Sequence, residues 1–124
     1  MINPKNHITI GEQQVGLYFG YPCFNDYTIA CLSEPKFASL QDGVGVAKLL
    51  HCAHENFCVI EETKATLKYQ DFYLWVEEKI NSDNRQEVEN LLNIWAECTT
   101  TKKSLERIAE LTKEDDQKKS LIAV

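Results

Sequence analysis

Residues 8–24 read ITIGEQQVGLYFGYPCF, and this segment decides how the fold begins. Gly11 and Glu12 suit a two-residue β-hairpin loop that has a positive φ at its first central position, and β-branched and aromatic residues flank the loop. Gly16 either weakens the second strand or marks a bulge. The competing interpretation is an irregular N-terminal loop. Alternation along the second strand predicts one face that carries Val15, Leu17 and Phe19.

A helix is expected directly after the hairpin. Pro22 suits the first turn of a helix, where its missing N–H costs nothing. Pro35 ends this helix at or before Glu34, because the residue that precedes a proline avoids helical geometry. The residues that recur at helical spacing are Phe24, Tyr27, Thr28, Cys31 and Leu32.

Most of the remaining chain is also predicted to be helical. Asp42 suits the N-cap of a second helix, and Ser82 or Asp83 suits the cap of the fourth. Residues 35–42 form a connection, and residues 57–67 fit either a short strand or an extended link. Apolar residues at helical spacing predict the second, third and fourth helices over residues 43–56, 69–80 and 84–99.

The predicted fold class is therefore α+β, mostly α. A short N-terminal β-hairpin packs on a bundle of about four helices, and residues 1–101 form this domain. Residues 102–124 form a charged amphipathic C-terminal segment, either docked at the edge of the domain or reaching for a partner, and its end is expected to be partly mobile. The narrow apolar stripe of this segment contains Leu105, Ile108 and Leu111.

Composition narrows the class of protein. A formal net charge of -6 argues against general binding of nucleic acid, which needs a basic surface. The chain has no apolar run near the ~20 residues of a membrane span and no signal-peptide pattern at its start. Its five cysteines, an odd number, favour reduced thiols. We therefore expect a cytoplasmic protein that binds neither nucleic acid nor membrane.

One group of side chains could bind a metal ion. His51, His54 and Cys58 share a face at positions i, i+3 and i+7 of a helix, and zinc accepts such ligands, with Glu55, Glu61 or water as the fourth. The competing interpretation is two surface histidines and a half-buried thiol. The sequence has no nucleophile elbow and no phosphate-binding loop. We therefore predict neither an enzyme nor a cofactor.

Aromatic residues crowd the third predicted helix. Tyr69, Phe72, Tyr73 and Trp75 cannot all face one small core, so Tyr69 and Tyr73 either remain for a partner or cover the hairpin. The candidate partner-binding residues are Tyr69, Tyr73, Leu74, Ile94, Leu105, Ile108 and Leu111.

The order of elements resembles that of the tail assembly chaperones of long-tailed, siphophage-type bacteriophages. The resemblance rests on a strand pair at Ile8–Phe19, a helix at Pro22–Leu32 and the segment Leu67–Glu77, which has an early acidic residue and Trp75-Val76 near its middle. The long segment 57–66 and the charged segment 102–119 depart from the family pattern.

The resemblance implies a mostly helical protein that forms homo-oligomers in the cytoplasm of the host cell. It would coat the helical tape-measure protein until tail-tube subunits polymerise around it, and a longer product made by frameshifting would be common. Two alternatives remain. One is a small regulatory or immunity-type protein that binds a single protein partner, and the other is a metal-binding protein that uses the His/Cys face.

Overall fold

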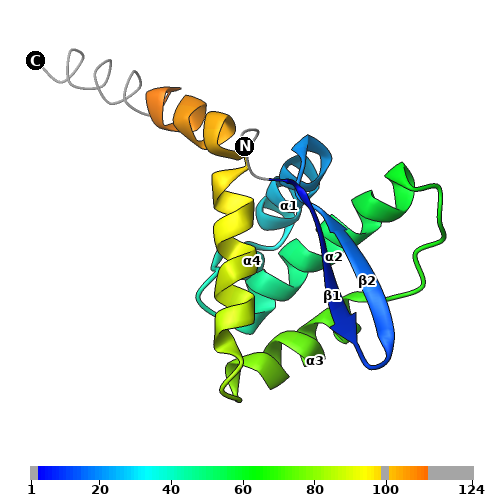
Figure 1. Ribbon diagram of the computed structural model, residues 1–124. Helices are drawn as coiled ribbons and strands as arrows, with labels where there is room; N and C mark the ends of the chain where they lie inside the picture. The colour runs from blue at the N-terminus through cyan, green and yellow to red at the C-terminus, as the bar shows by residue number, and fades with distance from the viewer. Residues whose placement is uncertain (1–2, 99–100, 112–124) are drawn as a thin grey trace, which may run out of the picture.

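The computed structural model describes residues 3–98 and 101–111 (Figure 1). In chain order the elements are β1 (Lys5–Ile10), β2 (Gln13–Tyr18), α1 (Tyr21–Ser33), the 3-10 helix η1 (Pro35–Ala38), α2 (Gly43–Ile60), α3 (Tyr69–Ile80) and α4 (Arg85–Glu97). Residues 101–111 are also helical, and we call them the 101–111 helix. The predicted fold class, a hairpin with a mostly helical body, is confirmed.

The hairpin forms where the turn residues predicted it. β1 and β2 pair antiparallel with Ile10 opposite Gln13, and Gly11 has a φ of 65°. The pairing is regular at Gly16, which lies opposite His7, so the alternative of a bulge there is wrong. Gly16 instead allows close packing, because an added Cβ would overlap the ring of Phe57. The predicted face of Val15, Leu17 and Phe19 is fully buried, with Phe19 directly after the end of β2.

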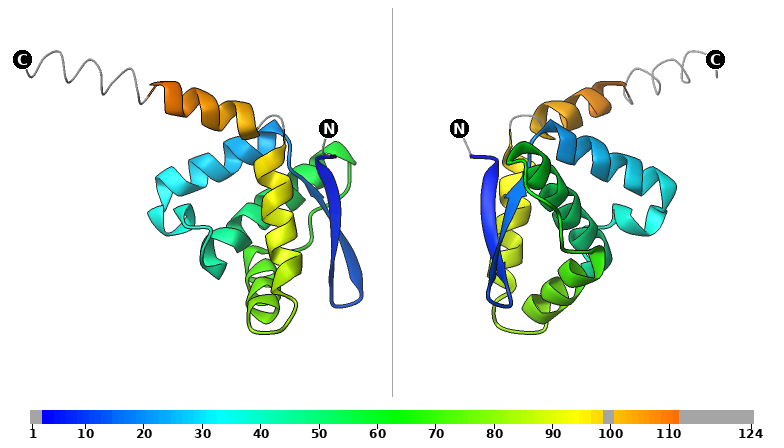
Figure 2. Two further views of the ribbon diagram at one scale, coloured as in Figure 1. Left: turned by 60° about the vertical axis from the view of Figure 1, so that its left-hand side comes forward. Right: turned by 90° about the vertical axis from the view of Figure 1, so that its right-hand side faces the viewer.

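Helix α2 is the centre of the molecule. It packs against β2, α1 and α3, and the hairpin and α1 lie on different sides of it (Figures 1 and 2). Asp42 caps this helix as predicted, because its Oδ1 accepts the backbone N–H groups of Val44 at 3.0 Å and Gly45 at 3.2 Å. α2 is buried around much of its circumference, since its neighbours approach from several directions.

The predicted end of α2 at residue 56 is wrong. The helix continues to Ile60, and the N–H of Glu61 donates to the carbonyl oxygen of Phe57 at 2.9 Å. Phe57 and Cys58 turn inward, so burial against the hairpin extends the helix. The short strand offered for this region is absent, and a link without regular structure covers residues 63–68.

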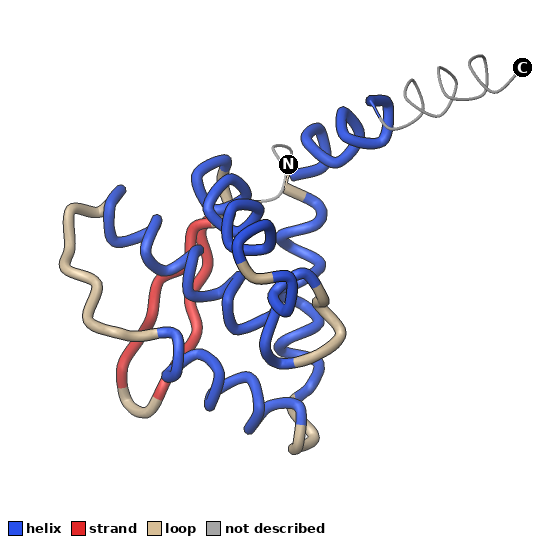
Figure 3. Tube along the Cα trace, turned by 180° about the vertical axis from the view of Figure 1, so that it is seen from behind, coloured by secondary structure: helices blue, strands red, loops and turns tan. Residues whose placement is uncertain are grey.

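Helices α3 and α4 are joined by a tight turn, from which α4 rises at a steep angle to α3 (Figure 3). α3 has the predicted bounds, and the Asp71 carboxylate accepts the N–H of Lys68 at its start, at 2.8 Å. α4 begins at Arg85, and neither predicted residue caps it: the N-cap is Asn84, and the Ser82 hydroxyl accepts only the N–H of Asn84 at 3.3 Å. The buried face of α4 consists of Val88, Leu91 and Trp95.

The 101–111 helix leaves the body beyond the end of α4 and runs past the start of α1 (Figures 1 and 2). Thr101 is fully buried, and the N–H of Lys102 donates to the carbonyl oxygen of Cys98 at 2.9 Å. Helix formation in this charged segment agrees with its predicted amphipathic pattern. The predicted mobile end of the segment, beyond residue 111, lies outside the described residues.

Candidate functional site

A hollow of about 270 Å³ lies between α1 and the 101–111 helix. Four residues from each helix line it, and we call it the α1 groove. The lining residues are Tyr21, Phe24, Asn25, Thr28, Ser104, Arg107, Ile108 and Leu111.

The sequence of α1 explains why the groove exists. Cys23 and Tyr27 face the core, and the phenol hydroxyl of Tyr27 donates to the carbonyl oxygen of Phe37 at 2.6 Å. Apolar residues also occupy the opposite side of the helix. Tyr21 is 61% exposed there and Leu32, eleven residues later, is 80% exposed. A helix that is apolar on both sides leaves surface for a partner unless the rest of the chain covers it.

The 101–111 helix covers only part of that surface. The side chains of Leu105, Ile108 and Leu111 are about half exposed, at 45%, 49% and 55%. Ile108 and Leu111 line the α1 groove, and Leu105 lies one residue away from Ser104 on the same helix. The structure therefore brings the predicted stripe of this segment onto α1 without burying it.

The other predicted partner-binding residues do not join this surface. Tyr69, Tyr73 and Ile94 are partly buried and pack against the core. The Tyr69 hydroxyl donates to the carbonyl oxygen of Val44 at 3.2 Å, and its ring meets that of Phe37. Leu74 is 55% exposed on α3, away from the residues that line the groove. The sequence alternatives for the tyrosines named a partner or the hairpin, whereas Tyr69 contacts η1 and α2.

Trp75 is the aromatic residue of α3 that hydrogen-bonds to the hairpin. Its indole N–H donates to the backbone carbonyl oxygen of Thr9 at 2.9 Å, and only 5% of the residue is exposed. This bond joins α3 to β1 across 66 positions of sequence. Trp75 therefore orients α3 beneath the hairpin.

The candidate metal ligands lie along α2 but do not converge. His54 Nδ1 lies 2.9 Å from the carbonyl oxygen of Gly16, which requires the proton on Nδ1 and leaves Nε2 as an acceptor facing the Cys58 thiol at 3.5 Å. His51 instead binds Glu55, with Nε2 2.8 Å from the carboxylate oxygen. Within residues 3–98 and 101–111, no three His, Cys, Asp or Glu side chains are grouped to hold a metal ion.

The competing interpretation, two surface histidines and a half-buried thiol, is wrong for His54 and Cys58. His54 and Cys58 are buried rather than on the surface, at 6% and 4% exposure. The imidazoles of His51 and His54 both pack against the ring of Phe72. His54 and Cys58 form a buried pair that does not line the α1 groove. The geometry assigns His54 to holding the hairpin on α2.

Burial also governs the ionisable groups around α2. Burial lowers the pKa of His51 below its usual value, against the opposing effect of Glu55. It raises the pKa of the Cys52 thiol to about 12 and that of Cys23 well above its ordinary range. These thiols stay protonated at neutral pH, so they are poor nucleophiles and poor metal ligands.

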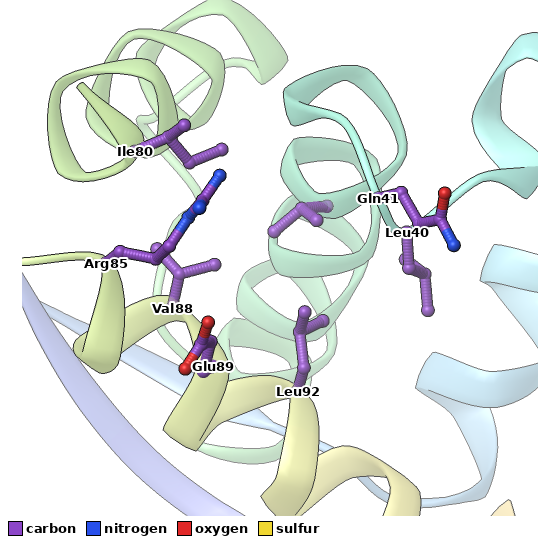
Figure 4. Close-up of a pocket in the computed structure, with 8 residues that line it drawn as sticks. Leu40, Gln41, Ile80, Arg85, Val88, Glu89 and Leu92 are labelled. Carbon is purple, nitrogen blue, oxygen red and sulfur yellow. The ribbon is translucent and has the colours of Figure 1, made fainter.

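A second hollow, of about 310 Å³, lies between the segment that leads into α2, α2 itself, the end of α3 and the first half of α4 (Figure 4). Val46, Val88 and Leu92 supply apolar surface, and Arg85 and Glu89 carry its charges. Neither this hollow nor the α1 groove is lined by a histidine, a cysteine or a pair of carboxylates. The lining of each hollow suits the binding of apolar side chains.

Sequence reasoning missed Tyr21, Ile29 and Leu32 as surface residues. Leu32 was named only among the residues at helical spacing, and it is the most exposed large apolar residue among those described. The available signal was that apolar residues surround α1 instead of forming one stripe. No helix in the described part of the chain has the length and hydrophobicity that a membrane span requires.

Comparison with known proteins identified no relative of this chain. No protein-family model matches this chain, and neither a curated protein nor a solved structure matches it.

Proposed function

We propose that this chain is a non-enzymatic tail assembly chaperone of a siphophage-type bacteriophage, which binds the helical tape-measure protein and helps recruit tail-tube subunits. The observation that carries the proposal is the apolar surface along α1, where Tyr21 and Leu32 are exposed and the 101–111 helix continues the surface with Leu111. An assembly chaperone needs such a surface, whereas an enzyme needs converging polar groups.

The shape of this surface suits a helix as its ligand. Tyr21, Thr28 and Leu32 recur at i, i+7 and i+11, so they form a line along α1 that is roughly 17 Å long at 1.5 Å per residue. Helices bind in such grooves through apolar residues at i, i+3, i+4 and i+7. The resemblance implies a long helical tape-measure protein as the ligand, and α1 would contact an apolar face of that helix.

The order of elements also supports the proposal. The hairpin is followed at once by α1, and the segment from Leu67 begins α3 with Asp71 at its start and Trp75-Val76 in the core. These are the features on which the resemblance rests. We infer a homo-oligomer as the working form, because each copy would then offer one groove to successive turns of a long helix.

The experiment is to dilute a denatured fragment of the tape-measure protein encoded in the same genome into buffer that contains the purified chain. We expect the chain to suppress light scattering from aggregation, and Leu32→Asp and Leu111→Asp to weaken that effect. Leu74→Asp is the matched control for Leu111→Asp, since Leu74 is also 55% exposed but lies on α3, apart from both α1 and the groove. Suppression that is absent, or lost equally in the control, would contradict the proposal.

Solution mass separates this proposal from the alternative of a small protein that caps a single partner. Static light scattering on the chelator-treated protein should give one defined oligomer. A strict monomer at high concentration would count against the chaperone and favour a one-to-one binding protein.

A further inference from the structure

We propose that the α1 groove selects a partner helix with an acidic residue at the edge of its apolar stripe, and that this residue pairs with Arg107. The inference rests on the proposed function of the groove as a site for a helix. It adds a charge preference, which the apolar surface alone does not provide.

The first argument is the charge of the lining. Arg107 is the one charged residue among the eight that line the groove, because α1 contributes only Tyr21, Phe24, Asn25 and Thr28. A lining of apolar and uncharged polar side chains with one guanidinium is complementary to an apolar helix face with one carboxylate beside it. A partner lysine at the same place would face the guanidinium and be disfavoured.

The second argument is that Arg107 forms no ion pair with any of the residues that the structure describes. The ion pairs of the described residues involve Lys5, Lys36, His51 and Lys79, and none includes Arg107. Glu110 is three residues away on the same helix, at a spacing that allows pairing, yet the two form no ion pair. The guanidinium, a planar donor suited to carboxylates, is therefore free for a ligand.

The net charge of -6 acts in the opposite direction and would repel an acidic partner at long range. The distance of each charge from the ligand decides whether repulsion by the net charge or attraction by Arg107 prevails. At physiological ionic strength the Debye length is about 8 Å, so charges elsewhere on the molecule are largely screened from a ligand in the groove. Arg107 lines the groove itself, so its contact survives that screening.

The test uses two designed amphipathic peptides of ~20 residues, long enough to form a helix on the groove. They are identical except that one position beside the apolar stripe is Glu in the first and Lys in the second, and each carries a fluorophore for anisotropy. We expect the Glu peptide to bind roughly two- to fivefold tighter, the range of an exposed ion pair. High salt should shrink the difference.

Variants of the full chain test whether Arg107 causes the difference in affinity between the two peptides. Arg107→Glu should reverse the preference and Arg107→Gln should abolish it, and both should keep the wild-type thermal transition because the side chain is exposed. The matched control is Arg85→Glu, since Arg85 is also an exposed arginine outside any described ion pair but lines the second hollow (Figure 4). The control should bind both peptides as the wild type does.

Each failure has a distinct meaning. Equal binding of the two peptides, or a preference that persists in Arg107→Glu, overturns the charge preference and leaves the groove as a helix site. Binding of neither peptide overturns both the preference and the groove as the site of the proposed function.

Discussion

The imidazole Nδ1 of His54 lies 2.9 Å from the carbonyl oxygen of Gly16, which is 38 residues earlier in the chain. Gly16 is opposite His7 in a ribbon of only two strands, so its carbonyl has no third strand to bind. The ring of Phe57 packs where Gly16 lacks a side chain. One turn of α2 thus satisfies the backbone of β2 and packs on it as well.

Replacing His54 tests this relationship. His54→Leu should lower the free energy of unfolding by about 1–3 kcal/mol, because it leaves the buried carbonyl of Gly16 without a donor. His54→Gln keeps an N–H donor and should lose less. The measurement is urea denaturation followed by circular dichroism. Equal stability of wild type and His54→Leu would show that the bond contributes nothing.

Two glycines at the start of α2 should respond differently to alanine. A Cβ on Gly45 would overlap the backbone carbonyl oxygen of Ser39, whereas a Cβ on Gly43 would meet Val76 at an ordinary 3.6 Å. Gly45→Ala should therefore destabilise the protein by about 1–3 kcal/mol through overpacking. Gly43→Ala should be neutral or slightly stabilising, because alanine favours helix. Thermal unfolding of the two variants makes the comparison, and equal losses would contradict the packing.

Buried thiols should react slowly in the native protein. Burial raises the pKa of Cys23, Cys52 and Cys98, and to about 12 for Cys52, so little thiolate is present at about pH 8. Timed alkylation with iodoacetamide and peptide mass spectrometry should show these three labelled far more slowly than in denaturant. Labelling of any of them at the denatured rate would contradict its burial.

His51 should make the protein less stable in mild acid. Its pKa is lowered in the folded state, chiefly by burial, so the unfolded chain takes up the proton more readily. The free energy of unfolding should then fall as the pH drops from about 7.5 to about 5.5, through the ordinary pKa of histidine. His51→Gln should show a shallower fall over the same range. If the pair with Glu55 prevailed over burial, the wild type would instead be the less sensitive of the two.

Features that depend on neighbouring residues were predictable from the sequence. Gly11 adopts the positive φ that a two-residue hairpin loop requires, and Asp42 caps α2 with its carboxylate. Helix α3 begins and ends at the predicted residues. Turn geometry and N-capping act over two or three residues, so the local sequence carries their signals. The signal was ambiguous at α4, where Asn84 and not Ser82 or Asp83 is the N-cap.

Features that depend on distant residues needed the tertiary structure. His54 is buried because β2 offers it a carbonyl, and α2 continues to Ile60 because Phe57 finds the space beside Gly16. Neither the burial of His54 nor the extension of α2 could be predicted from residues within one turn of the helix. The metal-binding and surface interpretations of the His/Cys face both failed to include the hairpin as the partner of His54.

The candidate site also combines features that the sequence determined with features that only the tertiary structure decided. By itself the sequence determined that the 101–111 segment would form an amphipathic helix with a narrow stripe, since side-chain periodicity follows from helical geometry alone. Only the tertiary structure decided that Tyr69 faces the core while Leu32 remains in solvent. The physical reason is that burial depends on which surfaces the packed helices cover, and a helix that is apolar on every side does not specify which side will be left exposed.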